Sequence, residues 1–183
     1  FSAEDEAESL LAGSRTLQRG HLRIAADSAT HVMPALARMR ERYPGLTFSL
    51  TIGNSSEVVD QIMDFAADVA ITARANSDPR IHSVRLRSDD LVAFVSDQHE
   101  LARHDQIPIE AFAGQDIVLR ERGSITREVF ENRLSTAGIK PANLLEVQSR
   151  EAGREAVAVG FGVGVVFAAE FGREAGVKRM IIT

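Results

Sequence analysis

The sequence contains no cysteine, which excludes disulfides and thiolate metal sites and agrees with a reducing compartment. It also lacks any apolar run near the roughly 18 residues that a membrane-spanning helix needs. No basic stripe is present either, and the formal net charge is −5. Because a duplex-binding surface usually needs such a stripe, the chain by itself is expected to bind neither nucleic acid nor membrane.

Signals for catalysis are few. No serine lies in a strand–turn nucleophile motif, and the charged helical stretches such as "REVFE" give no reason to assign an acid–base pair. The five histidines show no metal-ligand spacing; they are His21, His31, His82, His99 and His104. We therefore expect no enzyme activity, no metal and no cofactor. A small α/β enzyme stays an alternative that only the cleft predicted below favours.

The composition is that of a soluble globular protein. The 183 residues include 44% hydrophobic and 26% charged ones, enough for one large domain or two small lobes. The start, "FSAEDEAESLLAGS", is acidic and amphipathic, the opposite of a signal peptide, so we expect a cytoplasmic protein. Residues 1–18 have helical spacing from the first residue onward, which predicts a helix cut from a longer chain.

Two blocks of alternating strands and helices follow. In the first block, residues 21–26, 47–53 and 68–72 read as strands, with a helix over 31–43 and another that buries Val58, Ile62 and Phe65. This β-α-β-α-β order predicts a parallel sheet with right-handed crossovers.

The second block repeats the alternation. Strands are predicted over 91–95, 116–120, 144–148 and 162–167; helices are predicted after "RGS", ending at Gly138, and over 150–159. Two such blocks predict an α/β fold with a ligand cleft between them, beyond the carboxyl ends of the strands.

Polar residues follow almost every predicted strand. These are Asp27, Ser28, Thr30, His31, Asn54, Ser55, Ser56, Thr72, Arg74, Arg120, Arg122, Ser124, Thr126, Arg127, Ser149, Arg150 and Glu151. Hydroxyl and guanidinium groups beside helix N-termini suit a small anion. Each polar residue alone is better explained as a helix cap, and Asn54 with Glu57 resembles a capping box; the alternative for Arg120, Arg122 and Arg127 is a solvated surface charge. We interpret the joint pattern as a binding site.

The glycine-rich stretch "GFGVG" (160–164) has the wrong order for a phosphate loop. It lies between a helix and a following strand, whereas a phosphate-binding glycine run follows a strand and opens a helix. The sequence therefore favours a helix C-cap followed by closely packed backbone.

A family resemblance appears in "GHLRIAAD", "MPALARMRERYPGLTFSLTIGNSSEVVDQIMDFAADVAIT", "LVAFVSDQHELA", "RGSITREVFE" and "EAVAVGFGVGVV". Over roughly residues 20–167 the chain resembles the effector-binding domain of LysR-type transcriptional regulators. The resemblance implies an α/β fold of two Rossmann-like lobes with a ligand cleft between them, like the type 2 periplasmic binding proteins. It implies the end of a linker helix over 1–19, lobe I over 20–88, lobe II over 89–176, and a strand over 177–183 that returns toward lobe I.

The family's binding positions, carried over residue by residue, fall on the strand ends named above. They are Ser28, Thr30, Asn54, Ser55, Ser56, Thr72, Arg74, Gly123, Ser124, Thr126, Arg150 and Phe167; His31 and Arg120 join them from the strand-end pattern. The resemblance implies a small anionic effector, a homodimer or homotetramer, and DNA binding only through a helix-turn-helix that this sequence lacks. The family's C-terminal return segment is also expected to be missing.

Two further expectations concern the ligand and the class of protein. "IGNSSEVV" and "LRERGS" are similar to regulators associated with aminoethylphosphonate catabolism, which would place a phosphonate at the helix N-termini and an ammonium group on Asp27 or Glu151. The alternative is a free-standing binding protein that serves a transporter, and the acidic start argues against its export.

Overall fold

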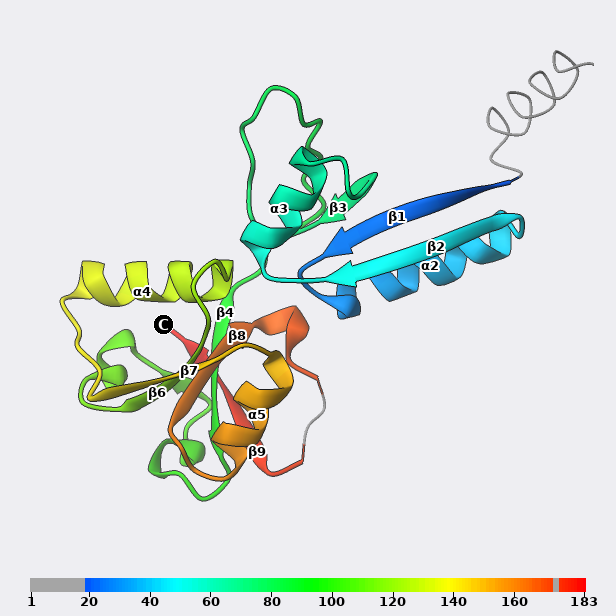
Figure 1. Cartoon of the computed structure of the whole chain (residues 1–183). Helices are drawn as coiled ribbons and strands as arrows, with labels where there is room; N and C mark the ends of the chain where they lie inside the picture. The colour runs from blue at the N-terminus through cyan, green and yellow to red at the C-terminus, as the bar shows by residue number, and fades with distance from the viewer. Residues whose placement is uncertain (1–18, 173–174) are drawn as a thin grey trace, which may run out of the picture. The chain divides into compact units, whose positions relative to one another are not determined.

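The computed structural model describes residues 19–172 and 175–183; the helix predicted over 1–18 lies outside them. The chain divides into two compact units, Phe1–Ser83 and Val84–Thr183 (Figure 1), a few residues before the lobe boundary predicted from the sequence. Within the described ranges no helix has the length and apolar character needed to span a membrane. Each unit is an α/β sandwich with its own sheet and core.

The first unit contains a three-stranded parallel sheet. Its strands are β1 (Gly20–Ala26), β2 (Leu46–Ile52) and β3 (Val69–Ile71), in the order β2-β1-β3. The crossovers are α2 (Ala29–Arg42) and α3 (Ser55–Met63). The predicted β-α-β-α-β order and its parallel pairing are confirmed, so the carboxyl ends of all three strands lie at one edge.

Both faces of this sheet are covered because side chains alternate along β1. Ile24 and Ala26 pack in one cluster with Val32 of α2, while Ala25 packs with Val58 of α3 in another. The two helices therefore cover opposite faces, and the last three residues of β1, Ile24 to Ala26, are buried between them.

One predicted core residue is wrong. The helical spacing of Val58, Ile62 and Phe65 predicts a buried Phe65, but α3 ends at Met63 and Phe65 is 82% exposed. The Ala66 N–H bonds the Gln61 carbonyl and the Phe65 N–H bonds that of Ile62, the two bonds of a Schellman ending. Phe65 takes the left-handed position of this ending, with φ 56°, where glycine is usual, so no glycine marks the end of the helix.

The second unit contains a mixed six-stranded sheet in the order β5-β9-β4-β8-β6-β7. The strands are β4 (Leu91–Ser96), β5 (Gln106–Ile107), β6 (Asp116–Arg120), β7 (Asn143–Val147), β8 (Val163–Phe167) and β9 (Val177–Ile182). The helical segments are η1 (Glu100–Arg103), η2 (Ile109–Phe112), α4 (Ile125–Ala137), α5 (Arg150–Ala158) and η3 (Ala168–Glu170). The predicted strands and helices of this block are confirmed, and the short elements β5, η1, η2 and η3 are additional.

The central strand β4 is buried along its whole length, as its continuous apolar run predicts. It pairs antiparallel with β8 and with β9, while β6 is parallel to both β7 and β8. The C-terminal strand β9 also pairs with β5, so its hydrogen-bonded neighbours belong to the second unit. The return of residues 177–183 toward lobe I stays a prediction.

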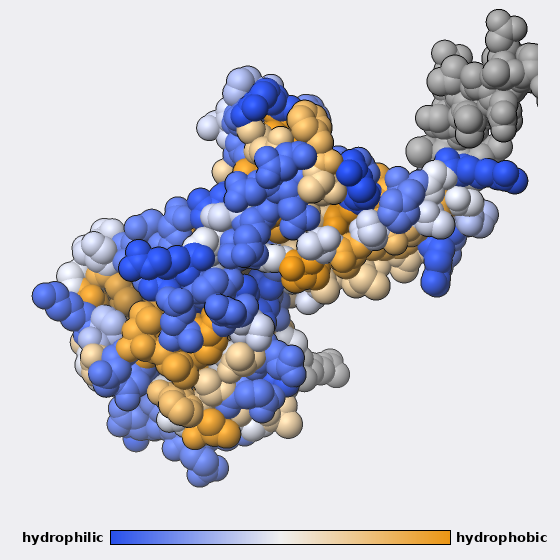
Figure 2. Space-filling view, viewed as in Figure 1, coloured by the Kyte–Doolittle hydropathy of each residue, from blue (hydrophilic) through white to orange (hydrophobic). Residues whose placement is uncertain are grey.

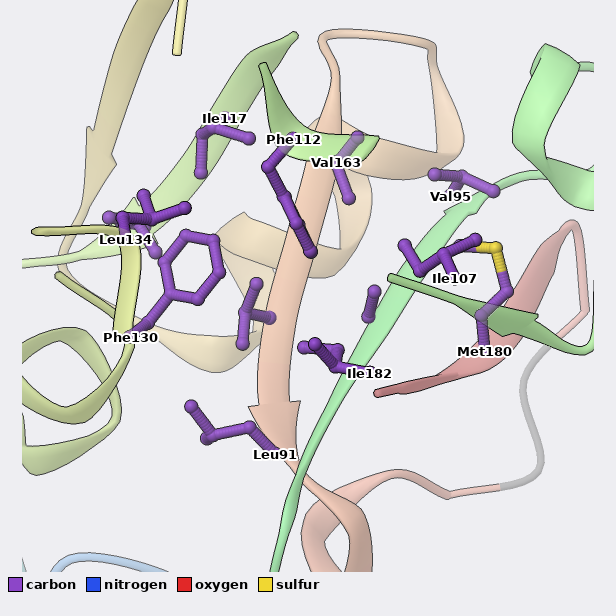
Figure 3. Packing of buried hydrophobic residues seen from close by; sticks show 13 residues of the cluster. Leu91, Val95, Ile107, Phe112, Ile117, Phe130, Leu134, Val163, Met180 and Ile182 are labelled. Atoms are coloured by element: carbon purple, nitrogen blue, oxygen red, sulfur yellow. The ribbon is translucent and has the colours of Figure 1, made fainter. Parts of the chain in front are cut away.

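Two apolar clusters lie on opposite faces of this sheet. The larger contains Phe112 of η2 and Phe130 of α4, whose ring centroids are 4.8 Å apart in an edge-to-face arrangement (Figure 3). The smaller joins Phe94 and Val118 to Val157 of α5. The sheet is therefore covered by α4 on one face and by α5 on the other.

The glycine-rich stretch that follows α5 is confirmed as a helix end followed by tight packing. α5 ends at Ala158, and Gly160 has φ 89°. A Cβ on Gly164 would lie 2.3 Å from the Phe94 ring, and one on Gly162 would lie 2.1 Å from the Asp116 carbonyl oxygen. These glycines allow close approach of β8 to its neighbours.

The surface of the second unit is mostly hydrophilic in the view of Figure 2, apart from an apolar patch over the edge strand β7. Leu144 of this strand is 43% exposed. Leu144 is not among the residues that line the pocket described below, whereas Val147 at the end of the same strand is.

Two surface ion pairs of the first unit stabilise charged carboxylates. The hydrogen bond from Arg23 lowers the pKa of Asp68 to about 2, and the hydrogen bond from Arg80 lowers the pKa of Asp78 to about 2. The Arg23–Asp68 pair joins β1 to the residue that precedes β3. It links the middle of β1 to the start of β3, away from the carboxyl ends of the strands.

Candidate functional site

The stretch Asn54-Ser55-Ser56 forms a complete helix cap. The Asn54 side chain accepts hydrogen bonds from the N–H groups of Ser56 and Glu57, both at 3.1 Å. The Glu57 carboxylate accepts the Asn54 N–H at 2.8 Å, which closes the capping box. The cap prediction is confirmed, and these donors of the α3 N-terminus already have protein partners.

Replacing Asn54 with alanine is expected to lower the free energy of unfolding by about 1 kcal/mol, because two first-turn N–H groups lose their acceptor. Urea denaturation of the Asn54→Ala variant measures this loss. Thr51→Ala, at an exposed position of the preceding strand, is the control. Equal stability of the two variants would show that the capping box contributes nothing measurable.

Asp27 organises the polar edge of the first unit. It follows β1 directly and is only 4% exposed. Its Oδ2 accepts from the Ser55 and Thr72 hydroxyls, both at 2.9 Å, and from the Ala73 N–H at 2.8 Å. One carboxylate thus joins the ends of β1 and β3 to the start of α3, and it uses the hydroxyl protons of two residues predicted to bind the ligand.

The N-terminus of α2 is capped differently from that of α3. Ser28 is the N-cap residue and is 3% exposed, but its side chain makes no cap hydrogen bond and no acidic residue lies in the first turn. Thr30, in that turn, is exposed, and His31 is half-buried. The positive end of this helix dipole is therefore not neutralised by a carboxylate of its own first turn.

Arg74 completes the predicted residues of the first unit. Its backbone N–H donates to the Thr72 hydroxyl at 3.1 Å, and the residue is half-buried. The turn after β3 is thereby linked, through Thr72, to Asp27. The predicted residues of the first unit all lie at the carboxyl edge of its sheet.

The second unit contains a pocket that encloses about 520 Å³, part of it open to solvent. Its polar lining includes Arg120 at the end of β6, Thr126 in the first turn of α4, and Ser149 and Arg150 at the start of α5. Its apolar lining comes from residues of β4, β6, β7 and β8, together with Phe171. Three residues predicted to bind the ligand, Arg120, Thr126 and Arg150, are thus brought to one cavity.

The remaining predicted residues of this unit lie outside that lining. Gly123 has φ 95° in the turn before α4, and Ser124 is the buried N-cap residue of α4, again without a side-chain cap bond. Phe167 ends β8 half-buried and packs against the larger core cluster. These residues shape the loops at the strand ends, and a ligand contact by any of them stays a prediction.

The arginines of the pocket are held by glutamates. Arg150 donates two hydrogen bonds to Glu170 of η3, at 2.7 and 3.1 Å, and the Glu170 side chain is 2% exposed. Arg120 donates two to Glu121, both at 2.8 Å. Such two-point pairs fix the guanidinium planes. The pocket therefore presents fixed cations whose charge is largely balanced.

Several pocket residues were not predicted from the sequence, among them Phe94, Gly153, Glu170 and Phe171. The first three lie within regular elements, where strand-end reasoning does not look. A signal existed for Gly153, because a glycine inside a predicted helix calls for a packing reason. No group of three or more potential metal ligands was found among residues 19–172 and 175–183.

Known proteins resemble this chain over most of its length. The family model described as the LysR substrate binding domain matches residues 15–181. The HTH-type transcriptional activator CmpR of Synechocystis sp. is 28% identical over 167 residues, covering 90% of this chain and 55% of that protein. The uncharacterized HTH-type transcriptional regulator YeiE of Escherichia coli is 34% identical over 147 residues, 79% of this chain and 50% of that protein. The chain thus spans about half the length of these relatives.

Among solved structures, the Synechocystis PCC6803 CcmR regulatory domain in complex with 2-PG has a TM-score of 0.80 to this chain. The two are 25% identical, and the match covers 90% of this chain and 81% of that one. The fold class predicted from the sequence, α/β of the type 2 periplasmic-binding-protein-like kind, is confirmed. Since the family model matches far more than half of the sequence, the chain belongs to the LysR substrate binding domain family.

Proposed function

We propose that this chain is the effector-sensing domain of a LysR-type transcriptional regulator that binds a small anionic metabolite in the bacterial cytoplasm. Binding changes the domain's conformational equilibrium, and the homodimeric or homotetrameric full-length protein passes this change to its DNA-binding domains. The observation that carries the proposal is the family match over residues 15–181. The domain itself performs no catalysis in this proposal.

Two features of the structure support an anionic ligand. The N-terminus of α2 has a buried serine N-cap without a side-chain cap bond and no acidic residue in its first turn, so its N–H groups and dipole favour an acceptor. The N-cap of α4 is of the same kind, although Glu128 lies in its first turn. The pocket of the second unit brings hydroxyl and guanidinium groups together over an apolar floor. The complex of the related CcmR regulatory domain with 2-PG agrees with a small ligand of this kind.

The finer expectation of an aminophosphonate gains no support from the relatives named above, which are described in other terms. 2-Aminoethylphosphonate is therefore tested as one member of a ligand panel. The transporter-binding alternative is not favoured either, since CmpR and YeiE are both HTH-type regulators.

The test is thermal unfolding of the domain with 2-PG, 2-aminoethylphosphonate, phosphate, sulfate, dicarboxylates and aromatic carboxylates. A ligand at about 100 times its dissociation constant adds about 2.7 kcal/mol of stability, so a clear rise in melting temperature is expected with at least one anion. A melting temperature that no member of the panel raises would contradict the proposal.

A variant locates the site. Thr30→Asp places a carboxylate in the first turn of α2, where it should stabilise the helix slightly and repel an anion bound there. We expect an equal or higher melting temperature without ligand and a much smaller ligand-induced shift. Ala37→Asp, which adds the same charge at an exposed position farther along α2, is the control. Equal ligand responses in both variants would remove α2 from the site.

A further inference from the structure

The pocket of the second unit contains a carboxylate for which the effector proposal gives no role. Glu170, at the end of η3, is the acidic residue of a lining that is otherwise apolar, hydroxyl-bearing or cationic. Its side chain is 2% exposed, against 32% for Arg150, its partner. The guanidinium of Arg150, which is partly open to solution, therefore already holds a buried carboxylate.

The other two lining arginines are arranged differently. Arg120 pairs with Glu121 and Arg154 pairs with Glu155, and neither glutamate lines the pocket. The negative charge inside the lining is thus that of Glu170, placed against the arginine at the first position of α5. From this position the Glu170 carboxylate repels any anionic group that approaches Arg150.

A doubly charged group meets two obstacles here. To replace Glu170 on Arg150 it would leave a buried carboxylate without its cation, which is strongly unfavourable. To bind beside Glu170 it would bring like charges together in a partly enclosed pocket, where they repel more than in open water. For a singly charged group the repulsion from Glu170 is about half as large. An apolar group neither displaces Glu170 nor is repelled by it.

The shape of the pocket agrees with an apolar occupant. Phe94, Val118, Val147 and Phe171 form part of the lining. Gly153 packs directly against this floor, since a Cβ there would be in van der Waals contact with Val147 Cγ2 at 3.4 Å and with Val118 Cγ1 at 4.0 Å. A flat ring or short aliphatic chain suits such a floor better than a compact, fully hydrated oxyanion.

We infer that Glu170 is a specificity-determining residue: it occupies Arg150, excludes dianions from the second-unit pocket, and reserves that pocket for a monocarboxylate with an apolar body. This inference rests on the proposed function in one respect, that the pocket belongs to the effector site. It narrows the effector's class from small anions in general to singly charged, partly apolar acids.

The test is isothermal titration of the domain with two probes, benzoate for the singly charged apolar acid and sulfate for the dianion. The wild-type domain is expected to bind benzoate more tightly than sulfate. Glu170→Gln keeps the shape of the side chain and removes its charge, so sulfate affinity should rise about tenfold or more, and benzoate affinity should rise less. The ratio of the two affinities is the readout.

Three controls make the result specific. Glu110→Gln removes the same charge from an exposed residue of η2 outside the lining, and should leave the ratio unchanged. The double variant Arg150→Gln/Glu170→Gln removes the cation as well, and should return sulfate affinity to the wild-type level. If Glu170→Gln does not fold, Glu170→Asp retracts the charge from Arg150 and should change the ratio in the same direction.

The outcomes separate the inference from the function. An unchanged ratio in Glu170→Gln, an equal change in Glu110→Gln, or no binding of either probe by wild type and Glu170→Gln alike would overturn the inference. Binding of sulfate by Glu170→Gln supports it even where wild type binds neither probe. The proposed function fails on a different observation, namely a wild-type domain whose melting temperature no anion of the whole panel raises.

Discussion

Replacing Asp27 with alanine is expected to lower the free energy of unfolding by about 3–5 kcal/mol, the largest effect of a single polar substitution that we predict. The Ser55 hydroxyl, the Thr72 hydroxyl and the Ala73 N–H would all lose their acceptor, and each buried donor left without one costs about 1–3 kcal/mol. Urea denaturation measures the total, and hydrogen exchange of the Ala73 amide measures the local part.

The substitution Asp27→Asn separates charge from hydrogen bonding. Its amide oxygen can still accept the three donors, so we expect a smaller loss of stability than with alanine. Asp60→Ala, an exposed carboxylate of α3, is the matched control and should have little effect. If Asp27→Ala were no less stable than Asp60→Ala, the carboxylate would not organise this edge of the sheet.

Replacing Gly162 with alanine is expected to cost about 3 kcal/mol. The new Cβ would lie 2.1 Å from the Asp116 carbonyl oxygen and 2.6 Å from its carbon. These are backbone atoms of β6, the neighbour of β8, so relief requires the two strands to separate. Overpacking of this kind typically costs 1–3 kcal/mol, and the positive φ of 148° adds strain. Urea denaturation and the melting temperature measure the loss.

Gly160→Ala is the matched comparison for that prediction. Gly160 also has a positive φ, of 89°, but no heavy atom lies within 4 Å of a Cβ placed there. Its substitution should therefore cost only the backbone strain, about 1 kcal/mol. Equal losses at the two glycines would mean that conformation alone, and not close packing of the strands, explains the "GFGVG" stretch.

The order of strands and helices could be predicted because each element has its own local period. Alternating Leu22 and Ile24 predict β1, and the continuous apolar run predicts the fully buried β4. The pairing in the second unit could not be predicted in the same way, since whether β4 runs antiparallel to β8 depends on contacts distant in sequence. The burial of Phe65 was predicted wrongly because a Schellman ending without glycine gives no signal in the sequence that the helix has ended.

The candidate site was predictable in position but less so in detail. The strand-end rule brings Ser28, Ser55 and Thr72 to one edge of the first sheet. It does not say that a buried Asp27 takes two hydroxyl protons there, although an acid directly after three buried residues of β1 needs nearby donors. The strand-end rule did not identify Glu170, because this residue lies at the end of η3, beyond the end of β8. Its contact with Arg150 depends on the fold.

The pairing of β4 also bears on how the protein is made. Ala93 at its centre pairs with Val165 on one side and Met180 on the other, so the middle strand of the second sheet is synthesised long before either neighbour. The first unit needs only β-α-β crossovers between successive strands. During translation the first unit can fold once β3 has emerged, whereas β4, apolar on both faces, must wait for β8 and β9. This interval is when the nascent protein is most exposed to aggregation and most dependent on chaperones.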